Sequence, residues 1–285
     1  MKKYLWQHTK ALLSKTSPEL YVKNRFKANL GYSPNFKNPK THNEHMAKRR
    51  FSYTEQMTLL SDKIAVRDYV AKKIGDKYLV PLLFEMDSLS ETIYNKLPNS
   101  FVIKANHGSG FNLLVKNKLD YSFEKLKQIT NNWLETKYHL LGMELHYKNI
   151  KPRLLVEELL LDEEGKVPKD YKFYCFESKK YLGVYVDRFV DTRVAFFDEK
   201  WEPADYPFIF KEVDDPREVK KPENFDEMIT VVSKLSQPFD YVRLDLYSVN
   251  NRIYFGEFTF TPGGGIDKFK TYEKDLEWGQ LWNKN

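Results

Sequence analysis

A chain of 285 residues can bury a large core in one or two domains, and its single cysteine, Cys175, excludes an internal disulfide. The net charge of +6 at pH 7 favours an anionic partner such as a nucleotide, a sugar acid or a membrane surface. Opposite charges are interspersed throughout, so we expect no nucleic-acid partner. No run of residues reaches the ~18–20 apolar positions that span a bilayer, and residues 1–15 lack the apolar core of a signal peptide. We therefore expect a cytoplasmic protein.

The first part of the chain, to about residue 57, is predicted to be helical and basic. Ser17-Pro18 is typical of a helix start, with an N-cap followed by proline at the first helical position. The segment Thr41–Glu44 has the spacing of a capping box. His42 lies within this segment and His45 directly follows it. The two histidines lack a metal-ligand spacing, so we expect both at the surface. The lysines of this region favour a weak contact with the inner membrane surface or, alternatively, a solvated helix face.

A glycine-rich segment follows the next predicted helix, Ser61–Ile74. The buried strand Phe101–Ala105 carries Lys104 and leads into the tip Asn106-His107-Gly108-Ser109-Gly110, and a second strand, Leu113–Lys116, leads out. Backbone N–H groups at such a tip can point at a phosphate. The alternative is a plain turn, since no helix start follows at once.

Two further predicted strands carry charged side chains. The apolar strand Arg153–Leu161 includes Glu157-Glu158, and Asp170–Phe176 alternates so that Lys172 shares a face with aromatic residues. The other predicted elements are the strands Tyr78–Phe84, Tyr181–Arg188 and Thr192–Phe197, and the helices Ser90–Leu97, Phe123–Tyr138, Phe225–Leu235 and Tyr272–Trp282.

The most informative stretch runs from Phe239 to Gly265. Its two predicted strands are Tyr241–Val249 and Ile253–Thr261, separated by the turn signal Asn250-Asn251. Because alternate side chains of a strand share a face, the first strand presents together Arg243, Asp245 and Tyr247. By the same alternation, the second strand presents Glu257, Thr259 and Thr261. Three glycines, Gly263–Gly265, then allow positive φ or a close approach of backbone.

The pairing register of these strands decides the chemistry. A two-residue turn would pair Asp245 with Gly256 and place Glu257 on the far face. A three-residue loop, Asn250–Arg252, would pair Asp245 with Glu257. Such opposed carboxylates repel unless a cation neutralises them, and Mg²⁺ prefers hard oxygen ligands. The pattern therefore indicates either a magnesium site or an ordinary hairpin with two solvated carboxylates.

Taken in order, these motifs resemble the ATP-grasp superfamily and, within it, the TupA-like ATP-grasp proteins of cell-surface polysaccharide biosynthesis. The resemblance covers about residues 40–270. The stretches that carry it are SDKIAVRDYVAKKIG, LPNSFVIKANHGSG, RLLVEELL, DYKFYCF, VDR, YVRLDLY and GEFTFTPGGG.

The resemblance implies an α+β fold, in which two lobes with antiparallel sheets clasp ATP behind a basic helical N-terminal segment. It implies three regions, namely the helical segment 1–60, a lobe with the glycine-rich phosphate loop at 61–156, and a lobe with the Mg²⁺-binding hairpin at 157–285. The implied cofactors are ATP and Mg²⁺.

The resemblance also implies roles for individual residues. The ATP-binding set would comprise Lys63, Lys104, His107, Gly108, Ser109, Gly110, Glu157, Glu158 and Lys172. Asp245 and Glu257 would hold Mg²⁺. Thr259 stands where most of the superfamily has Asn, and its hydroxyl is a weaker ligand. Arg243 and Lys172 would serve the transferred phosphoryl group. Arg188 and His107 would bind the acceptor carboxylate or, alternatively, be structural surface residues.

The implied activity is ATP-dependent ligation of a carboxylate to an amine through an acyl phosphate, joining an amino acid or peptide to a sugar acid of a surface polysaccharide. Three alternatives stay open. They are a kinase of this fold that phosphorylates a hydroxyl, a sugar transferase that consumes a sugar nucleotide, and a non-catalytic anion-binding module. The sequence indicates neither the acid, the amine nor the oligomeric state.

Overall fold

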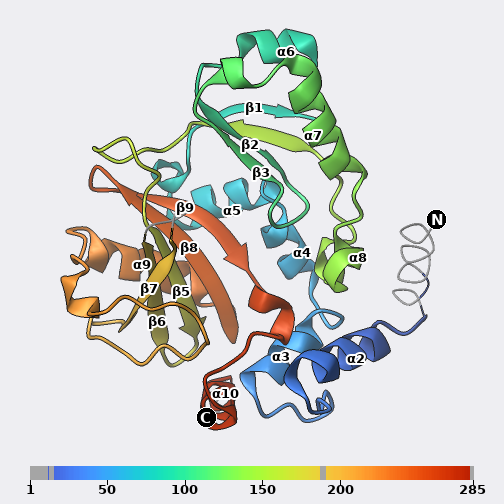
Figure 1. The fold of residues 1–285 in the computed structure, drawn as a ribbon, viewed down its shortest axis with the longest axis vertical. Coiled ribbons are helices and arrows are strands. Elements are labelled where there is room, and N and C mark those ends of the chain that lie inside the picture. Colours follow the sequence, from blue (N-terminus) through green and yellow to red (C-terminus); the bar gives the residue numbers. More distant parts are fainter. Residues whose placement is uncertain (1–11, 13–15, 187–190, 283–285) are drawn as a thin grey trace.

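The computed structural model describes residues 12, 16–186 and 191–282 and contains two antiparallel sheets with helices packed against them (Figure 1). One sheet has four strands and the other has five. The predicted α+β class is therefore confirmed. Among the described helices, none combines the length and the apolar character that a membrane span requires.

The four-stranded sheet forms one layer of the molecule. Its strands in spatial order are β1 (Leu82–Met86), β4 (Leu154–Glu157), β2 (Phe101–Ala105) and β3 (Asn112–Val115). Helices α6 (Glu91–Lys96) and α7 (Phe123–Glu135) lie over this sheet on the outside of the molecule (Figure 1). Phe101 and Ile103 of β2 pack in one buried cluster with Leu126 of α7. Burial of these apolar side chains holds the layer together.

The five-stranded sheet is the larger layer. Its strands in spatial order are β7 (Arg193–Asp198), β6 (Lys180–Val186), β5 (Asp170–Phe176), β8 (Tyr241–Val249) and β9 (Arg252–Thr259). Helices α5 (Ala65–Ile74) and α9 (Phe225–Ser236) share its largest buried cluster. Val242, Leu244 and Leu246 of β8 belong to that cluster, as their alternation predicts. The intervening side chains of β8 must therefore face the other side of the sheet.

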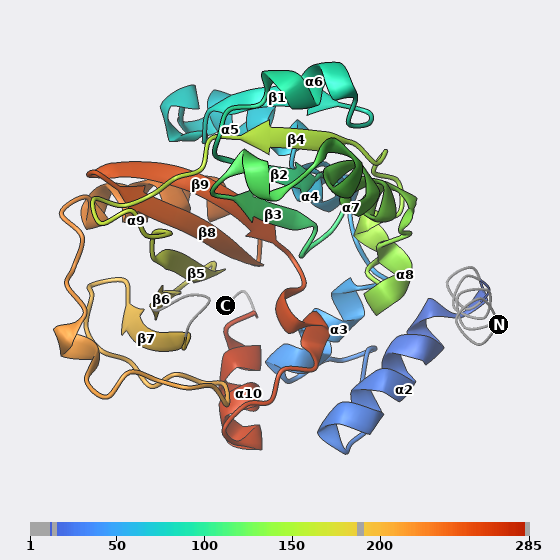
Figure 2. The same cartoon turned by 45° about the horizontal axis from the view of Figure 1, so that its top comes forward.

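That other side is aromatic at one end. Tyr174 of β5 and Tyr241 of β8 pack in a second buried cluster with Trp278 of α10 (Tyr272–Gln280), which lies beneath the sheet in Figure 2. Trp282 donates from its Nε1 to Nδ1 of His42 over 2.9 Å. The prediction of a surface position for His42 is therefore wrong, because its partner comes from the far end of the chain. Burial lowers the pKa of His42.

Three helices form the described part of the N-terminal segment. They are α2 (Pro18–Leu30), α3 (His42–Arg49) and α4 (Glu55–Ser61). The helix start at Pro18 and the capping box are confirmed, since Thr41 accepts from the backbone N–H of Glu44 and the Glu44 side chain accepts from that of Thr41. Helices α2 and α3 lie at the base of the molecule in Figure 1, whereas α4 lies higher, beside β9.

The predicted single helix Ser61–Ile74 is wrong at its start. Helix α4 ends at Ser61, and Asp62 Oδ1 then accepts from the backbone N–H groups of Ile64 and Ala65 at 2.9 and 3.3 Å. This interaction starts a separate helix, α5, because a carboxylate satisfies the free N–H groups at a helix N-terminus. Lys63 consequently lies in the turn between two helices, not on a helix face.

Short elements complete the fold. They are α8 (His139–Gly142) and the 3₁₀ turns Asp76–Tyr78, Lys118–Asp120, Leu145–Tyr147, Pro216–Glu218 and Pro262–Gly265. β5 and β8 have the predicted bounds. The predicted strand Tyr181–Arg188 is found as β6, and its last two residues lie outside the described part of the chain.

Candidate active site

The turn of the β8–β9 hairpin has two residues. Asn250 and Asn251 have φ of 50° and 56°, and Val249 pairs with Arg252. Positive φ at both central positions is what a two-residue turn of this kind requires, and asparagine tolerates it better than most residues. Of the two alternatives for this loop, the shorter is therefore correct.

The shorter turn nevertheless does not separate the carboxylates. The register shifts between Asp245 and Leu246, so that Gly256 becomes an extra residue on β9 and Asp245 pairs with Glu257. Beyond this bulge Arg243 pairs with Thr259. The expectation that a two-residue turn puts Glu257 on the far face is wrong, because one inserted residue reverses the alternation after it.

Two cations bind the buried carboxylate of Asp245, whose side chain is 3% exposed. Arg243 donates from Nε to Oδ1 at 2.7 Å and from Nη2 to Oδ2 at 2.8 Å, and the Lys172 ammonium also donates to Oδ2. Burial alone would raise the pKa of Asp245, but Arg243 and Lys172 lower it overall. Asp245 is therefore ionised at neutral pH.

Lys172 lies between two carboxylates of neighbouring strands. Its ammonium is 2.7 Å from Asp170 and also contacts Asp245. Burial would lower the pKa of Lys172, but Asp245 and Asp170 raise it overall. The ring of Tyr185 lies 5.5 Å from the Lys172 ammonium. The charged Lys172 is thus held between the carboxylates of Asp170 and Asp245.

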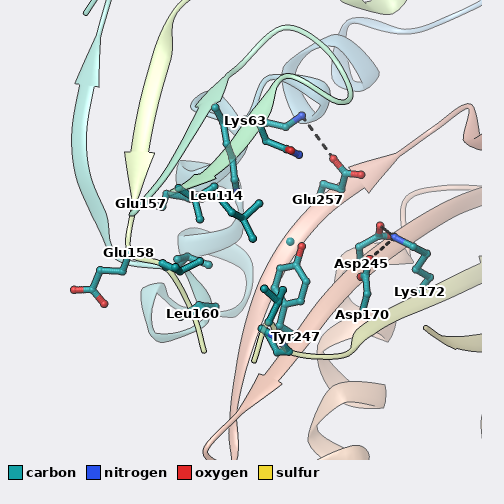
Figure 3. A pocket seen from close by; sticks show the side chains of 18 residues that line it. Lys63, Leu114, Glu157, Glu158, Leu160, Asp170, Lys172, Asp245, Tyr247 and Glu257 are labelled. Carbon is teal, nitrogen blue, oxygen red and sulfur yellow. Dashed lines mark hydrogen bonds and ion pairs between the residues drawn. The ribbon is translucent and has the colours of Figure 1, made fainter. Parts of the chain in front are cut away.

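A cleft of about 240 Å³ opens between the two sheets (Figure 3). At one end its lining is charged and includes Lys63, Lys172, Asp245 and Glu257. The Tyr247 ring points into the space between the sheets in Figure 3. Apolar side chains, largely from the four-stranded sheet and the segment after β4, complete the lining, including Val80, Val102, Leu114, Leu159 and Leu160. The cleft therefore offers an apolar surface and a charged surface to the same ligand.

Glu157, at the end of β4, is buried and forms ion pairs with two cations. It accepts from Nη1 of Arg67 at 2.7 Å and from Nζ of Lys104 at 2.6 Å. Arg67 also donates from Nη2 to the carbonyl of Val80 at 2.8 Å. The neighbouring Glu158 is exposed, and its carboxylate points away from the other labelled side chains in Figure 3. Glu157 thus positions Lys104 at the cleft wall.

The glycine-rich tip between β2 and β3 is tied to the other sheet by Lys63. The ammonium of Lys63 donates to the carbonyl of Gly108 at 2.8 Å and lies 3.6 Å from Glu257. An added Cβ at Gly108 would lie 2.6 Å from the ring of Tyr138, so glycine is required there. Gly110 has φ +76°. Lys63 therefore connects the predicted phosphate loop with the acidic hairpin.

The sequence matches the family model described as TupA-like ATPgrasp over residues 44–283.

The chain belongs to the TupA-like ATP-grasp family.

A comparison with curated proteins gives no match. Among solved structures, a D-alanine–D-alanine ligase from Helicobacter pylori is 17% identical, with a TM-score of 0.39 over 78% of this chain and 61% of that one. An L-amino acid ligase from Bacillus licheniformis is 12% identical, with a TM-score of 0.41 over 74% of this chain and 45% of that one. The chain thus spans less than two thirds of the length of these two proteins.

A second cleft, of about 290 Å³, adjoins the first in this ATP-grasp chain. Glu257 lines both clefts. The second lining also includes Arg25, Arg50, Ser109, Tyr138, Glu144, Tyr147, Arg243, Thr259, Thr261 and Gly264. Burial raises the pKa of Glu144, although hydrogen bonds from Thr261 and Tyr138 and the nearby Arg50 oppose this rise.

The structure brings together most residues that the resemblance singled out. The first cleft is lined by Lys63, Lys104, Glu157, Glu158, Lys172, Asp245 and Glu257, whereas Arg243 and Thr259 line the second. Of the glycine-rich tip, Ser109 lines the second cleft. His107 lies in neither lining, because its Nε2 is bonded to the Thr136 carbonyl at 3.2 Å and its ring is buried. Arg188 lies outside the described residues.

No site role was predicted for several side chains that line the clefts or contact residues in their linings. Asp170 contacts Lys172, and Arg67 contacts Glu157. Tyr247 had a usable signal, since it shares a strand face with Asp245. Arg25 and Arg50 carried no such signal, because their helices approach the hairpin only through tertiary packing.

The donor set of the hairpin fits a hard divalent cation. Asp245 and Glu257 offer carboxylate oxygens from paired positions, and the Thr259 hydroxyl lies on the same face. No group of three or more His, Cys, Asp or Glu side chains in the described part of the chain is arranged to hold a metal by itself. Mg²⁺ commonly binds through one or two carboxylates together with substrate phosphates. The pair therefore suits a magnesium ion that arrives with a nucleotide.

Proposed function

We propose that this ATP-grasp protein is an ATP-dependent carboxylate–amine ligase that joins an amino acid or peptide to a sugar acid during cell-surface polysaccharide biosynthesis. The observation that carries the proposal is the pairing of Asp245 with Glu257 across the bulge at Gly256. This pairing places two carboxylates on the same face as Arg243 and beside Lys172. Such a set suits a metal-bound triphosphate.

The first cleft matches the two ends of ATP. The base and ribose have an apolar surface to contact, which includes Leu114, Leu160 and Tyr247. The phosphates meet ammonium groups at the other end, where Lys63 and Lys172 lie, with Lys104 on the cleft wall. In a site shielded from water, such fixed positive groups stabilise developing negative charge strongly. Mg²⁺, when bound to Asp245 and Glu257, would neutralise phosphate oxygens.

The proposed ligation proceeds in two steps. A carboxylate oxygen of the acid attacks the γ-phosphorus, the bond to the bridging oxygen breaks, and ADP leaves. The amine nitrogen then attacks the acyl carbon, phosphate leaves, and the amine loses one proton as the amide forms. Arg243 contributes positive charge beside the phosphoryl group and the oxyanion, because it lines the second cleft next to Glu257. Lys63 holds the glycine-rich tip over the phosphates through the Gly108 carbonyl.

The testing experiment measures ADP release from Mg-ATP with sugar acids and amines supplied separately and together. Ligation predicts ADP release that needs both co-substrates, and an amide product in the mass spectrum. ADP release with a hydroxyl acceptor alone would support the kinase alternative. Consumption of a sugar nucleotide, without any use of ATP, would support the sugar transferase. Either of these results contradicts the proposal.

A further inference from the structure

The second cleft contains a buried guanidinium that has few partners. Arg50 follows α3 and is 1% exposed. Its Nη1 donates to the carbonyl of Gly264 at 3.0 Å, whereas its Nε has no hydrogen-bond partner among the described residues. A guanidinium has five N–H donors, and burying them without acceptors is costly. Arg50 therefore has donor capacity left for a ligand.

The glycine segment after β9 fixes this guanidinium in place. Gly264 has φ +62°, and a Cβ added there would lie 3.7 Å from Cζ of Arg50. Gly265 has φ +69°, and its added Cβ would lie 2.4 Å from the backbone nitrogen of Ala47 in α3. The close packing of this segment on α3 thus requires glycine. The glycine segment therefore holds Arg50 in the same wall of the second cleft as the end of β9.

A second arginine reaches this cleft from α2. Nη1 of Arg25 donates to the carbonyl of Leu141 at 3.2 Å and to the hydroxyl of Tyr21 at 3.4 Å. Arg25 precedes residue 44, where the match to the family model begins. It therefore belongs to a part of the chain that the family model does not describe.

The charges of the lining leave room for an anion. Arg243 is already bonded to Asp245, and Glu257 lies 3.6 Å from Lys63. This leaves Arg25 and Arg50 facing one carboxylate, Glu144. Glu144 is already bonded to the Thr261 hydroxyl. The lining thus carries one more cationic than anionic side chain, and a carboxylate matches the planar fork of an arginine.

We propose that Arg25 and Arg50 bind the carboxylate of an amino acid or peptide whose amine is the nucleophile. This inference rests on the proposed ligase function and assigns the substrate end that Arg188 and His107 were expected to bind. Glu257 lines both clefts, so a carboxylate held at Arg25 and Arg50 directs the amine toward the phosphate end of the first cleft. A site built to bond a carboxylate rejects amines that lack one.

Calorimetry on the full chain tests this assignment with defined probes. Each of the twenty L-amino acids is titrated into wild-type protein, and the tightest binder is compared with its carboxamide. The binder is then titrated into Arg25→Gln, Arg25→Lys and the control Lys23→Gln, which alters an exposed residue of the same helix. Loss of one charge-assisted bond predicts roughly tenfold or more weaker binding in Arg25→Gln. Arg25→Lys retains part of the affinity, and Lys23→Gln retains all of it. Unchanged binding of Mg-ATP shows that each variant is folded.

Three results would overturn the assignment. One is a wild-type protein that binds no amino acid more tightly than its carboxamide. Another is equal affinity in Arg25→Gln and Lys23→Gln. The third result uses glucuronate, titrated in the same way, as a sugar-acid probe. If Arg25→Gln loses glucuronate binding but keeps amino-acid binding, the second cleft binds the acid substrate.

The ligase proposal fails separately from this assignment. An amino acid could bind in an Arg25-dependent manner while no pairing of acid and amine releases ADP. This result would refute ligation but would still support the carboxylate site.

Discussion

Glu157 allows a sharp test of how the cleft is held in shape. Its side chain is 8% exposed and accepts from Arg67 and Lys104, whose side chains are 15% and 21% exposed. Glu157→Gln keeps the shape and removes the charge, so both cations lose their ionised partner in a largely buried place. Removing one partner of a buried ion pair costs about 3–5 kcal/mol, and water that still reaches Lys104 favours the lower end, about 3 kcal/mol.

Urea and thermal unfolding measure this loss directly. About 3 kcal/mol corresponds to a fall in Tm of roughly 5 °C, because the unfolding entropy of a chain of this size is about 0.6 kcal/mol/K. Glu158→Gln is the matched control, because it removes the same charge from the exposed neighbouring residue and should leave the unfolding midpoint within the error. Equal midpoints for Glu157→Gln, Glu158→Gln and wild type would refute the reasoning. A changed preference between ATP and GTP with unchanged stability would instead place Glu157 against the base.

Two further substitutions test the hairpin and the contact between α3 and α10, in which the backbone N–H and the side-chain amide of Asn43 donate to the Asp275 carboxylate at 2.9 and 3.0 Å. Gly256→Ala places a Cβ 2.8 Å from the carbonyl oxygen of Asp245, so we expect the bulge to be displaced and the stability in urea to fall by about 1–3 kcal/mol. Glu257 would then no longer pair with Asp245, and most of the turnover would be lost. Normal turnover in this variant would contradict the prediction. Burial raises the pKa of Asp275 to about 6, above about 3.9 in the unfolded chain. Stability from this group is therefore complete below pH 4 and is lost as the pH rises through 6, by about 3 kcal/mol. Asp275→Asn should flatten that fall relative to wild type, and parallel profiles of unfolding free energy against pH would count against the argument.

The faces of the strands and the bounds of β5 and β8 were predictable because they depend on short-range alternation. The predicted strands Tyr78–Phe84 and Arg153–Leu161 were misplaced or too long, since β1 is Leu82–Met86 and β4 is Leu154–Glu157. β5 and β8 have the predicted bounds, and Leu244 and Asp245 lie on opposite faces as expected. A period of two residues is visible within seven to nine positions, and no knowledge of distant partners is needed.

The register of the hairpin could not be predicted, although the turn was recognised. The turn at Asn250-Asn251 and the pairing of Asp245 with Glu257 were expected to exclude each other, and both occur. They are compatible because Gly256 forms a bulge, which a glycine inside a strand suggests but does not establish. Contacts across the sheet decide whether the glycine is bulged or paired.

Contacts between distant segments escaped prediction for the same reason. His42 is buried against Trp282, and Arg50 bonds to Gly264. Both contacts join the N-terminal helices to the C-terminal end of the chain, and a local pattern holds no information about which distant residue will approach. The predicted domain limits at 60 and 156 remain predictions.

The most direct test of the central claim is the binding of a non-hydrolysable ATP analogue by calorimetry, with and without Mg²⁺. The account predicts Mg²⁺-dependent binding to the wild-type protein, because Asp245 and Glu257 approach each other on paired strands. It predicts that this dependence on Mg²⁺ is lost in Glu257→Gln and in Asp245→Asn, while circular dichroism confirms that both variants are folded. Tight binding that needs Mg²⁺ in wild type and both variants alike would contradict the assignment of the two carboxylates to the metal.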